Sequence, residues 1–279
     1  MLSENIRIGL ASVRKARLRS FFTMLGVIIG VVSVVTIVSL GEGVKRQVVG
    51  QVTELGTNLI TVRPGNLVNR DENGKITSVN LFASAGIASL TSKDLDTISK
   101  LDSVQSAAAL GTVSGVPKYN NREFPDAVVI ATSQDLSKVI DHKVEFGTFF
   151  DSEMIKKKNA VIGPAVAEKL FNETIPIGKS FNFRGQSFTV QGVFEPFRNV
   201  PITSGINLNN AIFIPEPVAA EVNGGPVPIY EILVKTKNPE TVNQTAVAIT
   251  NALKENHAGQ QDYTVLLPNE ASAASDELL

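Results

Sequence analysis

The residues that come nearest to a chemical motif are Gly178-Lys179-Ser180, because a Gly-Lys-Ser triplet ends the P-loop that binds nucleotide phosphates. That motif also needs a glycine five residues before Gly178, and Glu173 stands there. The triplet is therefore expected to be a turn before a hairpin. In Gly111-Thr-Val-Ser-Gly115 the serine comes one residue later than the nucleophile elbow of a hydrolase requires. Neither motif predicts catalysis.

Histidine, cysteine and acidic residues give no better candidate for a catalytic or metal site. The chain has two histidines, His142 and His257, and no cysteine, which is too few ligands at too wide a spacing for a metal site that the sequence could reveal. Asp94 and Asp96 lie at the start of an expected helix and are predicted to be a cap and a surface group. A membrane-tethered hydrolase is disfavoured because no nucleophile–base set is visible. We expect a non-catalytic chain that holds no cofactor and no metal.

One uncharged stretch dominates the sequence, residues 21–40, FFTMLGVIIGVVSVVTIVSL. A helix of about 20 residues spans about 30 Å, the thickness of a bilayer's hydrocarbon core. The buried helix of a soluble protein is usually shorter. A cleavable secretory signal has an apolar region of about 7–15 residues and a small-residue cleavage site, and Val38-Ser39-Leu40-Gly41 matches such a site poorly. The stretch predicts a transmembrane helix that is not removed.

Small residues lie on one face of this predicted span, at Thr23, Gly26, Gly30 and Ser33. They allow another helix backbone to approach closely, so they predict helix–helix packing. Glycine is also common in membrane helices for no such reason, and a single GxxxG is a weak signal. Because residues 1–279 contain no second apolar stretch of this length, the partner helix is expected elsewhere.

The charge distribution predicts the orientation of the span. The first 20 residues hold five basic residues and one acidic residue, although the whole chain has a net charge of −1. Positive charge beside a span stays in the cytoplasm, so the N-terminus is expected inside the cell membrane and the main domain outside it. The positive flank consists of Arg14, Lys15, Arg17 and Arg19. The overall charge balance gives no indication of nucleic-acid binding.

Two helical segments are expected on either side of the span. Residues 1–20 read as an amphipathic elbow helix along the inner membrane face, or alternatively as a disordered basic tail. Residues 41–56 read as a stalk helix that continues the span, because apolar residues recur there at helical spacing. The stalk residues are Val44, Val48, Val52 and Leu55.

The rest of the chain predicts an α+β fold. Residues 57–110 and 227–268 each read as strand, helix, strand, and the two could form one βαβ–βαβ layer. Residues 111–226 have short segments broken by glycine, proline and asparagine and read as an inserted β-rich subdomain, and Asn66 to Gly86 reads as a mobile loop. Residues 269–279 are compatible with a helix that leads into a second transmembrane helix.

Several motifs in this order resemble MacB-like ABC transporter permeases, part of the wider FtsX-like group. The N-terminal motifs are Asn5-Ile-Arg7, Leu18-Arg-Ser-Phe21, Thr23-Met-Leu-Gly26, Ile28-Ile-Gly30, Gly41-Glu-Gly43 and Leu55-Gly-Thr-Asn-Leu-Ile-Thr-Val62. The downstream motifs are Gly147-Thr-Phe-Phe150, Val161-Ile-Gly163, Ala167-Glu-Lys-Leu-Phe171, Pro176-Ile-Gly-Lys179 and Phe188-Thr-Val-Gln-Gly-Val193. The resemblance extends over essentially the whole chain.

This resemblance implies a fold, partners and a function. A first span continues into a stalk and then into a porter-like α+β layer with a β-rich insert, and three further spans are expected after Leu279. The chain would be the N-terminal half of a permease that works as a homodimer in the membrane lipid with a separate ABC ATPase subunit. A membrane-fusion or adaptor protein is a possible further partner. The implied function is efflux of drugs, peptides or lipoproteins, or mechanotransmission. The alternative is a single-span extracytoplasmic binding or adaptor protein.

Overall fold

The computed structural model describes residues 17–54, 58–71, 76–80, 89–197, 206–268 and 270, and within the first of these ranges it describes the side chains of residues 21–39. Much of the predicted elbow, with Arg14 and Lys15, therefore lies outside the described residues, as does Leu55. The described part is a mixed α+β fold with one N-terminal apolar helix, as the sequence predicted.

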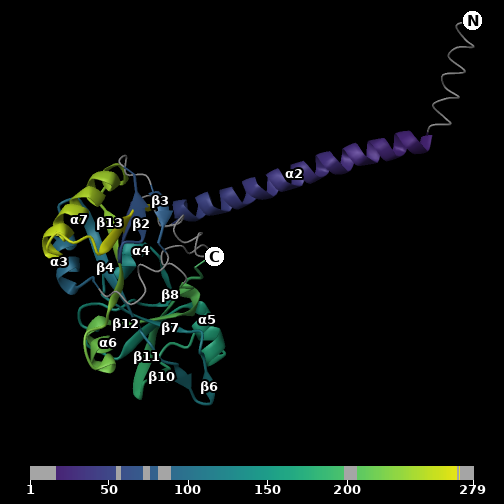
Figure 1. The fold of residues 1–279 in the computed structure, drawn as a ribbon. Helices are drawn as coiled ribbons and strands as arrows, with labels where there is room; N and C mark the ends of the chain where they lie inside the picture. Colours follow the sequence, from purple (N-terminus) through teal and green to yellow (C-terminus); the bar gives the residue numbers. More distant parts are fainter. Residues whose placement is uncertain are drawn as a thin grey trace, which may run out of the picture. The chain divides into compact units, whose positions relative to one another are not determined.

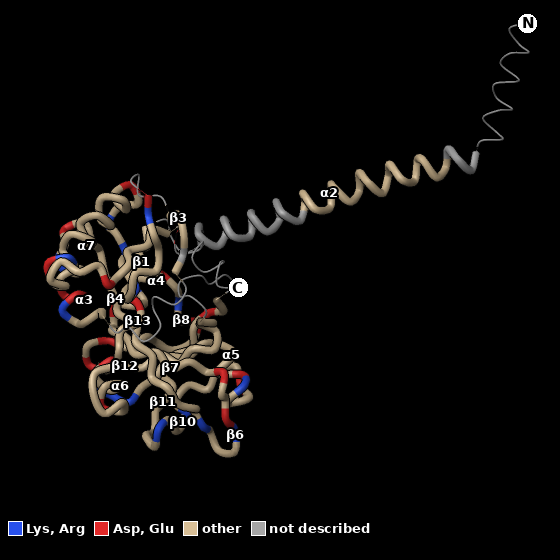
Figure 2. Tube along the Cα trace, viewed as in Figure 1, with Lys and Arg blue, Asp and Glu red and all other residues tan. Residues whose placement is uncertain are grey.

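The N-terminal helix α2 (Arg17–Glu54) is unbroken and includes Gly41 and Gly43 (Figure 1). Its 38 residues correspond to about 57 Å of helix. The helix begins before the predicted boundary at Phe21, because residues 17–20 contain no glycine or proline that would end it. Phe21–Ser39 is long and apolar enough to cross a membrane, and Figure 2 shows this part of α2 free of charged residues.

The remaining described residues are built on a 12-stranded mixed sheet. The first and last parts of the chain supply four of its strands, β1 (Leu59–Pro64), β4 (Val104–Val113), β13 (Ile229–Thr236) and β14 (Tyr263–Leu266). They lie in the order β14-β1-β13-β4, and each pairs with its neighbour in antiparallel fashion. Numbered along the chain this order is fourth, first, third, second, the arrangement of a ferredoxin-like βαββαβ unit. The predicted pair of strand–helix–strand units thus forms one layer.

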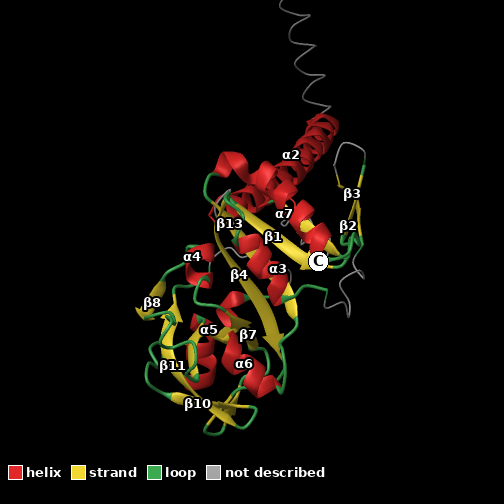
Figure 3. Cartoon of the chain, turned by 90° about the vertical axis from the view of Figure 1, so that its left-hand side faces the viewer, coloured by secondary structure: helices red, strands yellow, loops and turns green. Residues whose placement is uncertain are grey.

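Strand β4 belongs to both parts of the sheet (Figure 3). Residues 104–111 pair with β13, and residues 110–113 pair with β7 (Val128–Thr132), which begins the β-rich part. The sheet then continues through β12 (Ala211–Pro215), β9 (Asn159–Ile162), β11 (Gln186–Phe194), β10 (Ser180–Phe183), β5 (Lys118–Tyr119) and β6 (Arg122–Glu123), with β8 (Val144–Gly147) paired to β11. The predicted boundary at Gly111 falls inside β4, and the division into subdomains stays a prediction.

Helices cover both faces of this sheet. Helices α3 (Ser92–Ser99) and α7 (Val242–Asn256) pack on the ferredoxin-like strands. The other helical elements are α4 (Leu136–Ile140), α5 (Pro164–Val166), a π-helical turn η1 (Ala167–Phe171), α6 (Glu216–Asn223) and two 3₁₀ turns, η2 (Leu208–Asn210) and η3 (Pro239–Thr241). The segment formed by α5 and η1 is therefore α-helical only in its first turn.

The sheet has large apolar cores on both faces. On one face, Ile98 and Leu253 of the two covering helices pack on β1 and β13, and a separate core around Val218 packs α6 on the β-rich strands. On the opposite face one core extends across both parts of the sheet, with Leu110 and Phe213 among its members. The two parts of the sheet are therefore joined by packing on one face and separated by a gap between two cores on the other.

The stretch predicted to be a mobile loop contains a pair of short strands, β2 (Val68–Arg70) and β3 (Ile76–Val79). That part of the prediction was wrong. Leu67 and Val68 are buried against Leu266 of β14, so two apolar residues within a polar segment are enough to fix it. Arg70 and Glu270 add an ion pair with 2.5 Å between Nη1 and Oε1.

Candidate functional site

The first candidate is the small-residue face of α2. Thr23, Gly26, Gly30 and Ser33 lie in the exposed apolar part of the helix. A Cβ added at Gly26 or Gly30 would have no neighbour within 4 Å inside this chain. The single chain therefore does not test whether another helix packs there, and the role of these four residues stays a prediction.

The stalk residues and the positive flank also stay predictions. Val44, Val48 and Val52 lie within α2, which confirms that the helix continues into this segment, but their side chains are not among those described. The same holds for Arg17 and Arg19 at the start of the helix.

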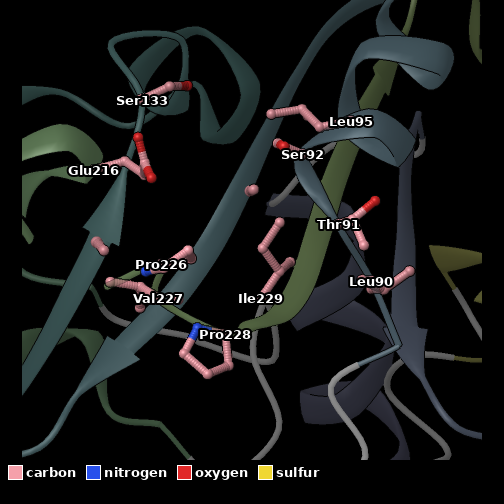
Figure 4. Close-up of a pocket in the computed structure, with 13 residues that line it drawn as sticks. Leu90, Thr91, Ser92, Leu95, Ser133, Glu216, Pro226, Val227, Pro228 and Ile229 are labelled. Carbon is pink, nitrogen blue, oxygen red and sulfur yellow. The ribbon is translucent and has the colours of Figure 1, made fainter. Parts of the chain in front are cut away.

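The second candidate is a cleft of about 590 Å³ in the sheet-containing part, on the face where the two cores are separate (Figure 4). Helix α3 and the residues before it line one side, and Ser133 and Glu216 line the other. The lining residues are Leu90, Thr91, Ser92, Leu95, Ala109, Gly111, Ala131, Ser133, Glu216, Pro226, Val227, Pro228 and Ile229. Such a volume lies within the range of about 300–1,000 Å³ that is typical of small-molecule sites.

The cleft exists because the sheet carries small residues at this place. Ala109 and Gly111 of β4 and Ala131 of β7 point to the same face, and they leave space where larger side chains would join the flanking cores. Gly111 has no free space above it, because a Cβ there would lie 2.6 Å from Cγ1 of Val227. Ala109, by contrast, is only half-buried. Ala109 is thus the part of the floor that opens toward solvent.

The polar groups of the cleft differ in whether they already have a partner within the protein. The Thr91 hydroxyl donates to Oδ2 of Asp94 at 2.8 Å, and the Ser133 hydroxyl oxygen accepts from the Asp135 backbone N–H at 3.3 Å. Glu216 is the one charged residue that lines the cleft, its side chain is exposed, and it forms no ion pair with any residue in the described ranges. The cleft therefore combines apolar walls with one available carboxylate.

A buried ion pair lies on the opposite face of the ferredoxin-like layer. Arg63 of β1 and Glu231 of β13 approach within 3.6 Å between Nη2 and Oε1, and their side chains are 7% and 0% exposed. Burial raises the pKa of Glu231 to about 7, and the positive charge of Arg63 only partly counteracts this effect. Neither Arg63 nor Glu231 is among the residues that line the cleft, so the pair is a structural rather than a catalytic candidate.

His257 connects the two helices of the ferredoxin-like layer. Its Nδ1 lies 2.6 Å from Oδ1 of Asp262, and its Nε2 lies 3.3 Å from Oδ1 of Asp94. Asp94 also accepts from the Thr91 backbone N–H at 2.8 Å, which confirms that it caps the start of α3, and from the side chain of Asn256. Asp96 is exposed, as expected of a surface group. The side chain of Asp94 is buried between α3 and α7 in addition to its capping role, which the sequence did not predict.

These contacts do not form a catalytic set. The Thr91 hydroxyl donates to the carboxylate of Asp94 and not to His257. The residues of the suspected P-loop, Gly178-Lys179-Ser180, lie before and at the start of β10, and Gly178 has φ +80°, as expected of a turn. Lys179 pairs with Glu173, the residue that stands where a P-loop needs glycine.

Comparison with known proteins decides the family. The family model described as the MacB-like periplasmic core domain matches residues 20–252. The chain belongs to this MacB-like family. This result confirms the resemblance that the motifs indicated.

Curated relatives of this MacB-like chain carry the name "Macrolide export ATP-binding/permease protein MacB". The protein of this name from Neisseria meningitidis is 29% identical over 262 residues, which cover 93% of this chain and 38% of the relative. That from Campylobacter fetus is 27% identical and covers 94% of this chain and 38% of the relative. The chain thus spans well under half the length of these relatives.

Solved structures confirm the fold. The periplasmic region of MacB from Actinobacillus actinomycetemcomitans has a TM-score of 0.63 at 20% identity and covers 81% of this chain and 95% of that one. The extracellular domain of the ABC-type transporter YknZ from Gram-positive bacteria has a TM-score of 0.57 at 21% identity and covers 75% of this chain and 100% of that one. The sheet-containing part of the MacB-like chain therefore has the fold of these periplasmic and extracellular domains.

The cleft, the buried pair and the His257 contacts were all missed at the sequence level. The cleft is lined by residues from five separate segments of the MacB-like chain, and the Arg63–Glu231 ion pair joins β1 to β13, which lie far apart in the sequence. One signal could have been noticed, namely the run of small residues Ala107-Ala-Ala109 before Leu110-Gly111, which is unusual for the centre of a large sheet.

Proposed function

We propose that this chain is the N-terminal part of a permease subunit in an ABC-type exporter or mechanotransmission complex. The observation that carries the proposal is the continuity of α2 over Arg17–Glu54 in a chain of the MacB-like family. A membrane helix satisfies its main-chain hydrogen bonds internally. An unbroken helix that leaves the bilayer can therefore convey a displacement made at the membrane to the part that follows.

In this proposal α2 crosses the cell membrane with its N-terminus in the cytoplasm. ATP binding and hydrolysis by an ABC ATPase subunit draw two copies of the permease together, and the movement reaches the extracytoplasmic sheet-containing part. The ATPase role is supported by the words ATP-binding and permease in the names of the relatives. A second permease copy, membrane lipid and a membrane-fusion or adaptor protein are the remaining partners, and the cargo class is drugs, peptides or lipoproteins.

The absence of cysteine gives a direct test of the orientation. Ser12→Cys and Ser92→Cys each introduce a single thiol before or after the span, and Ser92 is exposed. In intact spheroplasts a membrane-impermeant maleimide is expected to label the Ser92→Cys variant and to label the Ser12→Cys variant only after lysis. The opposite labelling, or a soluble product that lacks residues 1–40, contradicts the proposal.

Self-association of the span gives the second test. Replacing both Gly26 and Gly30 by leucine is expected to weaken association of two full-length copies in lipid nanodiscs by roughly tenfold, because the larger side chains prevent close backbone approach. Association is measured by energy transfer between copies labelled at Ser92→Cys. The control is Ile28→Leu with Val35→Leu, which lie on the opposite side of the helix.

The outcomes of this experiment distinguish the proposal from its alternative. If wild-type copies do not associate in the presence of an ABC ATPase subunit, the dimeric permease is wrong and a single-span adaptor is favoured. If the chain associates and the Gly26/Gly30 double variant associates equally well, the packing role of these glycines is wrong.

A further inference from the structure

We propose that the cleft between α3 and α6 binds an amphiphilic cation, an apolar molecule that carries a single amine. This assignment concerns binding only, and it stands independently of whether the chain serves a transporter. Three observations support the proposal: the position of the cleft, the sizes of the side chains on its floor and the charge on its edge.

The position of the cleft makes it a lasting feature of the fold. On the opposite face of the sheet, Leu110 and Phe213 belong to one core that packs across the junction of the two sheet parts. On the cleft face, the core of α3 and α7 and the core of α6 remain separate. The junction can therefore hold together without filling the cleft, and a molecule that enters does not have to displace a core side chain.

The walls select an apolar molecule. Leu90 and Leu95 lie on one side, and Val227 and Ile229 lie at the lower and central part of the opening (Figure 4). None of these four side chains is polar, so an apolar body of suitable size replaces water there with a gain of about 25 cal/mol for each Å² that is covered. The half-buried Ala109 at the floor leaves the depth that such a body needs.

The charge on the edge selects a cation. Glu216 is the one charged residue among those that line the cleft, and it has no ion-pair partner within the described ranges. The positive N-terminal ends of the two helices beside the cleft are already compensated, that of α3 by Asp94, which accepts from the Thr91 backbone N–H, and that of α6 by Glu216 in its first turn. An anionic ligand would therefore approach a carboxylate and meet no free positive charge in the cleft.

Three probes with the same apolar body separate these contributions: 1-adamantylmethylamine, 1-adamantylmethanol and 1-adamantanecarboxylate. The full chain carrying Ser92→Cys is labelled with bimane and held in lipid nanodiscs, so that the signal reports on the protein and not on probe dissolved in lipid. We expect saturable binding with the amine tighter than the alcohol, and the carboxylate weakest.

Two substitutions test the two parts of the site. Glu216→Gln is expected to weaken binding of the amine by roughly five- to tenfold, which is the usual effect of removing a partly exposed charge pair. Binding of the alcohol is expected to stay unchanged. Ala109→Leu is expected to weaken both by more than about tenfold, because its side chain fills the floor of the cleft. The matched controls are Glu240→Gln, an exposed carboxylate away from the cleft, and Thr112→Leu, the exposed residue on the other face of β4.

Melting temperatures of all variants establish that each is folded. Equal binding of the carboxylate and the amine, or unchanged amine binding in the Ala109→Leu variant, overturns the proposal. These outcomes leave the membrane orientation and the association tests untouched, so a failure here is distinct from a failure of the proposed function.

Discussion

Replacing Arg63 by methionine is expected to destabilise the sheet-containing part by about 3–5 kcal/mol at pH 8.5 and by much less at pH 5. Arg63 faces Glu231 across β1 and β13, and both side chains are buried. Removing the arginine leaves a carboxylate that water cannot reach. Methionine keeps most of the volume, so packing is largely preserved.

The direction of the pH dependence follows from the raised pKa of Glu231, about 7 against an ordinary value of 4.5. Between pH 4.5 and about pH 7, the carboxyl group of Glu231 is protonated in the folded state and ionised in the unfolded state. The stability contributed by this proton is complete below about pH 4.5 and is lost as the pH rises through about 7. At pH 5 the carboxyl is protonated with or without Arg63, whereas at pH 8.5 the wild type ionises it beside a positive charge and the variant ionises it alone.

Chemical unfolding of the full chain in detergent, followed by circular dichroism at both pH values, measures the effect. Arg63→Met combined with Glu231→Leu removes both charges and is expected to recover the loss or to exceed wild-type stability by about 1–4 kcal/mol. Arg122→Met, at an exposed arginine, controls for the substitution itself and should stay within about 0.5 kcal/mol. An equal loss at both pH values would show that the charge of Glu231 is not responsible.

Gly147→Ala is expected to cost roughly 3 kcal/mol or more, while Gly178→Ala costs about 1 kcal/mol. The two glycines have almost the same backbone angle, φ +79° and φ +80°, so the strain from a left-handed alanine is shared. The two positions differ in the free space that is available for a Cβ atom. A Cβ at Gly147 would lie 2.1 Å from the carbonyl oxygen of Gln191, whereas at Gly178 nothing lies within 4 Å.

The extra cost at Gly147 arises because strand β8 must move away from β11, with which it pairs at Gly192. Unfolding curves of the two variants, measured side by side, isolate this steric effect. Equal costs would contradict the close approach of the two strands. The glycine of the Gly147-Thr-Phe-Phe150 motif thus has a packing reason, which the motif alone could not supply.

Strong local patterns made much of the fold predictable. The strand–helix–strand pattern of residues 57–110 and 227–268 was expected, and β1 (Leu59–Pro64) and α7 (Val242–Asn256) lie in these two segments. A hairpin was expected after the turn at Gly178-Lys179-Ser180, and β10 and β11 form it around Arg184-Gly185, both of which have positive φ. The continuation of α2 beyond the span was expected because apolar residues recur there at helical spacing.

What could not be predicted depends on residues far apart in the chain. The strands β2 and β3 form where Val68 meets Leu266, and nothing in the polar local sequence indicates this contact. The burial of Asp94 depends on Asn256 and His257 at the far end of α7. The cleft exists because no large side chain from another segment covers Ala109, and the sequence of β4 does not reveal this.

The shared strand β4 has a consequence for synthesis on the ribosome. The β-rich strands β5 to β12 follow β4 without interruption, so they can assemble on it while the chain is still being made. The other edge of β4 must wait for β13, and β1 must wait for both β13 and β14, which follow the whole β-rich part in the chain. Both edges of β1 therefore stay unpaired until β13 and β14 have been made, and a chaperone or the membrane surface that shields residues 59–64 during this interval would raise the yield of folded protein.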